Sequence, residues 1–154
     1  MKEYQDKLRK YIRDHDIKAE ILTFNQSTHS VAEAAEAVGA DPDEFVKSIC
    51  MIGPDDKLIV AIVKGEDRAS RSRVAKALNI KRPRIAKPSE MLEKSGYPVG
   101  GTPAFGYDAV FLIDPKVMEK KQVYSGGGSD QALTLMSPQE MQRSNNAKIA
   151  RVRS

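Results

Sequence analysis

The sequence has few of the residues on which common enzyme sites depend. Its 154 residues include no tryptophan, one cysteine (Cys50) and two histidines (His15 and His29). A single cysteine excludes an intrachain disulfide. So few cysteines and histidines also argue against a zinc site, which needs three or four such ligands at set spacings. Neither histidine stands in a context typical of a catalytic triad. We therefore expect a protein with no metal and no other cofactor.

Motifs for nucleotide phosphates and for membranes are also missing. There is no GxxxxGK[ST] loop and no GxGxxG after a strand, which argues against the enzymes that use them. The longest aliphatic run, Leu58 to Val63, is far shorter than a membrane span. The N-terminal MKEYQDKLRK lacks the apolar core of a signal peptide. Because aromatic residues make up only 6%, there is little material for a base-stacking platform. We expect a cytoplasmic chain with no membrane partner.

The remaining composition is typical of one globular domain. Hydrophobic residues make up 40% of the chain and charged residues 30%. A chain of this length buries roughly two thirds of the surface of its unfolded form. No internal repeat, low-complexity tract or long linker divides it. The sequence predicts a single domain over residues 1–154.

Positive charge is concentrated in one short stretch of the chain. Residues 68–87 carry eight basic side chains and no acidic one, whereas residues 1–67 carry 9 basic and 14 acidic side chains. The eight are Arg68, Arg71, Arg73, Lys76, Lys81, Arg82, Arg84 and Lys87. A polyanion such as nucleic-acid phosphate stabilises like charges at this density, so we predict RNA binding here. The alternative is a solvated basic helix whose ion-pair partners lie in the acidic N-terminal part.

Apolar spacing, caps and chain breakers predict helices mixed with hairpin-connected strands. Helices are expected over residues 2–15, 31–38 (capped by Ser30), 72–78 and 88–95, with short helices after Asp41, Asp114 and Ser137. Strands are expected over residues 21–24, 47–52, 58–63, 84–86, 109–113, 122–124, 132–136 and 148–152. This order does not support a regular βαβ repeat. We predict an α/β domain with a curved, mixed, mostly antiparallel sheet or barrel and helices around it.

Two glycine-rich loops and one lysine are candidate site features. The loops are GYPVGGTPAFG (96–106) and SGGGS (125–129), whose backbone N–H groups can be aimed at an anion or a carbonyl oxygen. The alternatives are a plain helix-to-strand connection for the first and a flexible hairpin tip for the second. Lys47 enters an apolar strand, where a lysine usually snorkels to solvent. Cys50, among apolar neighbours, is expected to be buried and inert.

Three segments in this order resemble one known family. They are VAEAAEAVGADPDEFVKSI (31–49), the segment from LIVAIVKGEDR to GGTPAFG (58–106), and SGGGSDQALTLMSPQEM (125–141). Together they resemble the YbaK/ProX group of aminoacyl-tRNA deacylases, which includes the editing domain inserted into bacterial prolyl-tRNA synthetases. The resemblance covers about residues 20–142. It implies a curved mixed sheet or barrel with surrounding helices, and metal-independent hydrolysis of the ester between a wrong amino acid and tRNA.

The resemblance also implies site residues. The family's functional lysine falls on Lys47, and the glycines of its catalytic loop fall on Gly100 and Gly101. The predicted substrate-binding residues are Thr28, Pro103, Ala104, Phe105, Gly106, Gly126, Gly127, Gly128 and Ser129. At the fifth position of the loop the family has a proline, whereas this chain has Ala104 and places Pro103 one position earlier. The amino-acid preference and the edited tRNA therefore stay open.

Hydrolysis of an activated ester needs a positioned water and stabilisation of the developing oxyanion. We expect the oxyanion donors among the backbone N–H groups of Gly100, Gly101 and residues 126–128. Lys47 would hold phosphate or ribose oxygens as a point charge. The sequence predicts a trans-acting deacylase of mischarged tRNA, with tRNA and an aminoacyl-tRNA synthetase as partners. The alternative is a non-catalytic tRNA-binding or regulatory module on the same fold. A small-molecule hydrolase would leave the basic stretch without a role.

Overall fold

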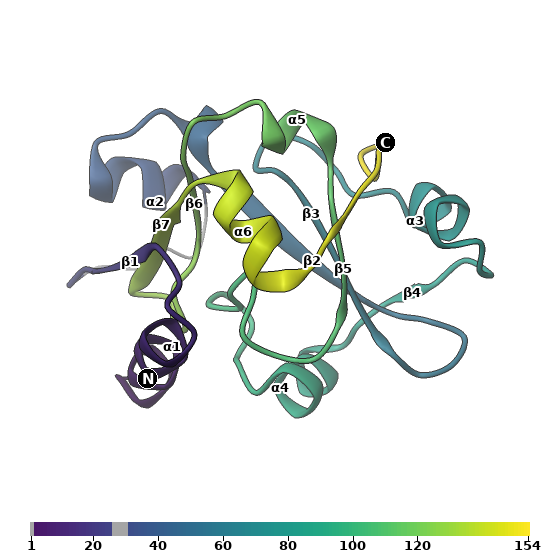
Figure 1. Ribbon diagram of the computed structural model, residues 1–154, viewed down its shortest axis with the longest axis horizontal. Helices are drawn as coiled ribbons and strands as arrows, with labels where there is room; N and C mark the ends of the chain where they lie inside the picture. Colours follow the sequence, from purple (N-terminus) through teal and green to yellow (C-terminus); the bar gives the residue numbers. More distant parts are fainter. Residues whose placement is uncertain (1, 26–30) are drawn as a thin grey trace.

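Two β-sheets form the centre of the fold in the computed structural model, which describes residues 2–25 and 31–154 (Figure 1). The larger sheet has the order β4 (Arg84–Ile85), β2 (Val46–Ile52), β3 (Leu58–Lys64), β5 (Val110–Ile113) and β8 (Lys148–Ile149). The smaller sheet has the order β1 (Ala19–Thr23), β7 (Ala132–Met136) and β6 (Val123–Gly126). The smaller sheet is antiparallel throughout, whereas β5 pairs in parallel with both β3 and β8 in the larger one.

Strands β2 and β3 form a hairpin at the centre of the larger sheet. Seven residue pairs join them, from Val46 opposite Lys64 to Ile52 opposite Leu58. The turn is closed by Gly53, whose N–H donates to the Lys57 carbonyl at 2.9 Å. Residues 58–63 of β3 are all buried, as expected for a strand with neighbours on both edges and packing on both faces. The hairpin therefore forms the buried centre of the larger sheet.

The alternation of side chains along β2 separates two parts of the core. Val46, Cys50 and Ile52 belong to the main hydrophobic cluster, together with Tyr97 and other residues of the 96–106 loop region. Met51 points to the other face, where it packs in a second cluster with Val74 of helix α3. A one-residue shift of register would exchange these two faces, so the apolar pattern fixes the register.

Six α-helices in the described part of the chain surround the sheets (Figure 1). They are α1 (Lys2–Asp14), α2 (Val31–Val38), α3 (Arg71–Leu78), α4 (Pro88–Ser95), α5 (Pro115–Met118) and α6 (Pro138–Asn145), with a 3-10 turn, η1, at Pro42–Glu44. The Ser70 hydroxyl caps α3 by accepting from the Arg73 N–H at 3.1 Å. Asn79 and Gly96 end α3 and α4 in the left-handed conformation. No helix in residues 2–25 and 31–154 is long and apolar enough to cross a membrane.

The predicted α/β class is confirmed, and each predicted helix or strand has a counterpart. The bounds 31–38, 88–95 and 132–136 are the predicted ones, and the other predicted ranges are shifted at one or both ends. The expected cap Ser30 lies outside the described residues. The expected curved sheet is divided into two sheets, and the described strands form no closed barrel. One parallel bridge, Phe45 to Tyr124, connects the two sheets. The last strand is shorter than predicted because the Val152 N–H donates to the Asp114 carboxylate at 2.9 Å rather than to a neighbouring strand.

Candidate active site

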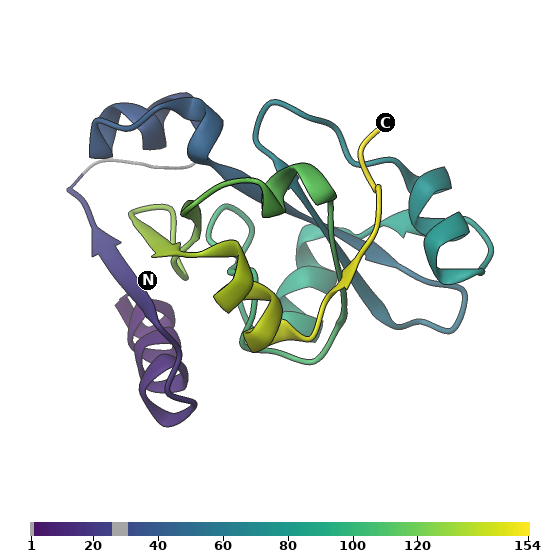
Figure 2. The same cartoon turned by 45° about the horizontal axis from the view of Figure 1, so that its top comes forward.

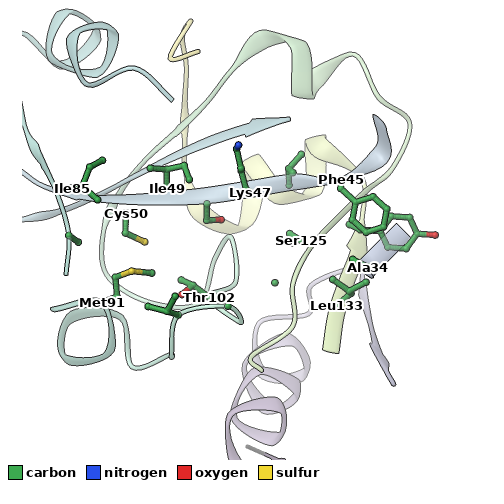
Figure 3. Close-up of a pocket in the computed structure, with 17 residues that line it drawn as sticks. Ala34, Phe45, Lys47, Ile49, Cys50, Ile85, Met91, Thr102, Ser125 and Leu133 are labelled. Carbon is green, nitrogen blue, oxygen red and sulfur yellow. The ribbon is translucent and has the colours of Figure 1, made fainter. Parts of the chain in front are cut away.

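A pocket of about 340 Å³ opens along one edge of strand β2 (Figure 3). Near the start of β2, Phe45 bridges Tyr124, and near its end Met51 pairs with Ile85 of β4. Between these two contacts, none of the described strands pairs with this edge of β2. The pocket occupies that interval, so strand pairing at its two ends defines its position.

Successive side chains of β2 project from opposite faces of the strand, and residues of both faces line the pocket. Figure 3 shows Lys47 and Ile49 projecting from one side of the strand, while Cys50 projects from the opposite side, toward Met91 and Thr102. Lys47 is half-buried, and its amine makes no hydrogen bond or ion pair with any residue that the structure describes. One residue of the lining thus carries a cation with no partner among the described residues.

The rest of the lining is mostly apolar and neutral. Burial raises the pKa of the Cys50 thiol to about 12, so this side chain is protonated at neutral pH and is a poor nucleophile. The Oγ atoms of Ser48 and Ser125 are buried and have no hydrogen-bond partner among the residues that the structure describes. Ala86 and Met91 complete this part of the wall. Lys47 is the one charged side chain among the described residues that line the pocket.

The two glycine-rich loops pack against each other behind the pocket. The Gly128 N–H donates to the Gly101 carbonyl at 2.8 Å. A Cβ atom added at Gly101 would lie 2.4 Å from the Ser129 nitrogen, and one at Gly126 would lie 2.2 Å from the Thr102 carbonyl oxygen. These glycines are required because two backbones approach too closely for any side chain.

This packing limits which backbone groups are available to a ligand. The N–H groups of Gly101 and Gly128 are already used, the first as a donor to the Pro98 carbonyl at 3.2 Å. Gly100 and Thr102 line the pocket, and their N–H groups have no hydrogen-bond partner among the described residues. These two N–H groups are therefore better candidate oxyanion donors than those of Gly101 and Gly128.

The structure brings some of the predicted site residues to the pocket and places others behind it. Lys47, Gly100 and Gly126 line the pocket. Gly101, Gly127, Gly128 and Ser129 are buried and do not line it. Pro103, Ala104, Phe105 and Gly106 are also outside the lining, and Ala104 and Phe105 belong to the main hydrophobic cluster. Thr28 lies outside the described residues. The functional roles of all these residues stay predictions.

Sequence reasoning missed several lining residues, among them Ser48 and Met91. Ser125 lies in the candidate loop 125–129 but was given no role of its own. Ser48 lies beside Lys47, so adjacency to the predicted site was a usable signal. Met91, in the middle of α4, carries no comparable signal in the sequence. Across residues 2–25 and 31–154, no three His, Cys, Asp or Glu side chains gather in a way that could hold a metal ion.

The basic stretch runs from α3 to the pocket. Figures 1 and 2 show α3 and β4 at the end of the molecule opposite to α1 and β1. Within the described residues the stretch makes one ion pair, between Arg84 and Glu90 at 2.6 Å, and Arg71 donates to the Pro83 carbonyl at 2.7 Å. Arg73 is half-buried. The exposed cations with no ion-pair partner in the described chain are Arg68, Lys76, Lys81, Arg82 and Lys87. The stretch thus keeps most of its positive charge.

Comparison with known proteins identifies the family. Residues 25–144 match the model of the aminoacyl-tRNA editing domain. The chain belongs to this family. The editing domain is 24% identical over 132 residues to the uncharacterized protein YwhH of Bacillus subtilis, an alignment that covers 84% of this chain and 83% of YwhH.

Three further likenesses concern one synthetase and two solved structures. The editing domain is 27% identical over 120 residues to the proline–tRNA ligase of Pseudothermotoga lettingae, covering 77% of this chain but 21% of the ligase. The crystal structure of the hypothetical protein APE2540 superposes with a TM-score of 0.88 at 28% identity, over 96% of this chain and 99% of that one. A candidate trans-editing enzyme for prolyl-tRNA synthetase has a TM-score of 0.88 at 24% identity, over 98% and 97% of the two chains. The last likeness shows a shared fold.

Proposed function

We propose that this chain is a trans-acting aminoacyl-tRNA deacylase that hydrolyses the ester of a mischarged tRNA in the cytoplasm. The observation that carries the proposal is the pocket at the free edge of β2. Its lining includes a half-buried lysine with no partner among the described residues, and a loop whose N–H groups at Gly100 and Thr102 have no hydrogen-bond partner in the same part of the chain. Membership of the aminoacyl-tRNA editing domain family supports the same reaction class.

The reaction follows from the chemistry of the ester. A water molecule attacks the carbonyl carbon and loses a proton, the carbonyl oxygen becomes an oxyanion, and the bond to the ribose oxygen then breaks. That ribose oxygen takes up a proton, and the products are the free amino acid and a tRNA with a free terminal hydroxyl. The N–H groups of Gly100 and Thr102 would stabilise the oxyanion, a contribution that usually dominates in such sites. The neighbouring ribose hydroxyl of the substrate would help to position the water.

Lys47 would bind the substrate rather than remove a proton. A charged ammonium is a strong point charge but a poor base, and Lys47 has no carboxylate partner among the described residues. We assign it to the terminal phosphate or ribose oxygens, which holds the ester in place. The basic stretch, which reaches the pocket through Ile85 of β4, would contact further phosphates. Such contacts give affinity without selecting a sequence.

The direct test is the release of labelled amino acid from purified mischarged tRNAs. A panel of tRNAs charged with alanine, cysteine, serine or threonine would identify the substrate, and we expect at least one to be hydrolysed faster than in buffer. We expect the rate to persist after exhaustive chelation, because the sequence has too few His and Cys residues for a zinc site. Loss of activity on chelation, with rescue by zinc, would contradict the metal-independent mechanism.

The second candidate function is a non-catalytic tRNA-binding module. It is favoured by one departure from the family pattern, since Ala104 replaces the expected proline and is fully buried in the main hydrophobic cluster. A prolyl-tRNA synthetase would be the partner in either case. Tight tRNA binding without hydrolysis of any tRNA in the panel would support this module and exclude the deacylase.

A further inference from the structure

Helix α1 contacts both glycine-rich loops of the pocket, although it lies outside the residues that match the editing-domain model. At the start of the first loop, the Lys7 amine donates to the Gly96 carbonyl at 3.2 Å and lies 4.6 Å from the centre of the Tyr97 ring. At its end, a Cβ atom on Gly106 would lie 3.6 Å from the Tyr11 ring. The helix therefore contacts this loop near both of its ends.

The contact with the second loop is closer and more specific. The Gln5 amide donates to the Ser129 hydroxyl at 2.8 Å, across 124 positions of the chain. A Cβ atom on Gly128 would lie 2.8 Å from the Tyr4 carbonyl oxygen, so the backbones of the helix and the loop touch. Ser129 is fully buried, and its hydroxyl also accepts from the Gln131 N–H at 3.2 Å. Gln5 thus holds Ser129, the residue that directly follows the glycine run, in place.

The contacts continue from this residue to the pocket. Ser129 follows Gly128, whose N–H donates to the Gly101 carbonyl, and Gly101 lies between the two lining residues Gly100 and Thr102. Each link is a hydrogen bond or a backbone contact without an intervening side chain. Movement of Ser129 would therefore shift Gly128 and, through its hydrogen bond to Gly101, the loop that carries the candidate oxyanion donors. An error of about 1 Å in such donors costs on the order of 100-fold in rate.

We propose that Gln5 is a positioning residue of the active site, and that helix α1 holds the two glycine-rich loops in their hydrolytic arrangement. The rate part of this inference rests on the proposed deacylase function. The structural part, that Gln5 orders the loops, does not. Without the Gln5 hydrogen bond, the loop that presents the candidate oxyanion donors would be less ordered, whereas the basic stretch would be unchanged. We therefore expect loss of Gln5 to lower kcat and to leave KM for tRNA nearly unchanged.

The test compares Gln5→Met, which keeps the length of the side chain but cannot hydrogen-bond, with Gln5→Glu, whose carboxylate can accept from the Ser129 hydroxyl. Gln139→Met is the matched control, since Gln139 is an exposed glutamine in the first turn of α6. Amide hydrogen exchange of the full chain at Gly127 and Gly128 reports loop order without any substrate. We expect Gln5→Met to speed exchange there and to lower kcat about tenfold or more. Gln5→Glu should stay within about threefold of wild type, because the hydrogen bond can re-form.

The two readouts separate the possible failures. Faster exchange in a chain that hydrolyses no mischarged tRNA would overturn the proposed function but support the structural role of Gln5. Unchanged exchange at Gly127 and Gly128 in Gln5→Met would overturn this inference, whatever the activity. Equal losses of kcat in Gln5→Met and Gln139→Met would overturn it as well, because the effect would then not depend on the contact with Ser129.

Discussion

The pocket edge of β2 and the basic stretch differ in the number and exposure of their cations and in how tightly the backbone around them is packed. At the pocket, one half-buried cation stands among apolar side chains, and the glycine loops are packed backbone against backbone. In the basic stretch, most cations are exposed, and the described chain supplies one ion pair, Arg84 with Glu90. The first arrangement fixes geometry, whereas the second provides a positive field that solvent and salt can screen.

This difference separates two tasks that the proposed deacylase would have to perform. Hydrolysis depends on a few groups held at fixed positions, so small changes at the pocket should act on turnover. Attachment to tRNA depends on the number of phosphate contacts, so changes in the basic stretch should act on affinity and on its salt dependence. Substitutions in one region at a time therefore separate the two tasks.

The largest effect is expected from Lys47→Ala. We expect single-turnover hydrolysis to fall about 100-fold or more, because an ester that Lys47 no longer holds is misplaced relative to the candidate oxyanion donors. The free energy of unfolding should change by no more than about 0.5 kcal/mol, because Lys47 has no partner among the described residues. Lys57→Ala, at an exposed lysine of the β2–β3 turn, is the control. Wild-type rates in Lys47→Ala would remove Lys47 from the site.

A smaller effect is expected from Gly101→Ala, compared with Gly39→Ala. At Gly101 the new Cβ would meet the Ser129 backbone, and such overpacking costs about 1–3 kcal/mol. At Gly39, with φ of +66° and open space around it, the cost is about 1–2 kcal/mol of left-handed strain. Chemical denaturation should therefore show similar destabilisation in both. Only Gly101→Ala should lose deacylation under native conditions, and equal activity in the two variants would contradict the role of the loop contact.

Removing three exposed charges from the basic stretch should weaken tRNA binding. We expect the slope of log K against log salt to become shallower by about 2–3 in Lys76→Gln/Lys81→Gln/Arg82→Gln, since each phosphate contact contributes about 0.9. The control triple, Lys57→Gln/Lys116→Gln/Lys121→Gln, removes the same charge from exposed positions elsewhere. Filter binding at several salt concentrations measures both. Identical slopes in the two triples would show that net charge, rather than the basic stretch, determines binding.

The smallest effect on function is expected at Asp114, which holds the C-terminal segment next to α3. Burial raises the pKa of Asp114, but hydrogen bonds from the backbone of Val152, Lys116 and Arg153 bring it below its ordinary value of 3.8. Because the folded pKa is lowered, its stabilising contribution is present above about pH 4 and is lost as the pH falls through the folded value. Asp114→Asn should cost about 1–3 kcal/mol at pH 7 and flatten the loss of stability in acid, as measured by thermal unfolding. A wild-type acid profile in this variant would contradict the assignment.

Local signals in the sequence were sufficient for most of the secondary structure. Pro88 and Gly96 bound α4 as expected, and the Ser137 hydroxyl caps α6 by accepting from the Glu140 N–H at 3.1 Å. The apolar runs of β2 and β3 form the predicted hairpin. These features depend on residues that are close in the chain, where propensity and capping decide the outcome.

The pocket itself could not be predicted from the residues alone. It exists because β2 is paired near both ends of one edge and unpaired between them, through contacts with Tyr124 and Ile85. The glycines of the two loops were read as ligand-binding elements, whereas the structure explains Gly101 and Gly128 by their contact with each other. Long-range contacts of this kind leave no periodic signal, so only the resemblance to a family pointed to Lys47 before the structure was available.

The central claim is that turnover and attachment are located in different regions, and one measurement tests it most directly. Single-turnover rates at saturating enzyme, together with Kd for uncharged tRNA, should be determined for Lys47→Ala and for the Lys76/Lys81/Arg82 triple variant. We predict that Lys47→Ala loses turnover by about 100-fold or more because the ester is misplaced. Its Kd should stay within about threefold of wild type, because the phosphate contacts of the basic stretch are retained. The triple variant should show the reverse, with a wild-type rate once enzyme saturates the tRNA. Parallel losses of rate and affinity in both variants would contradict the account.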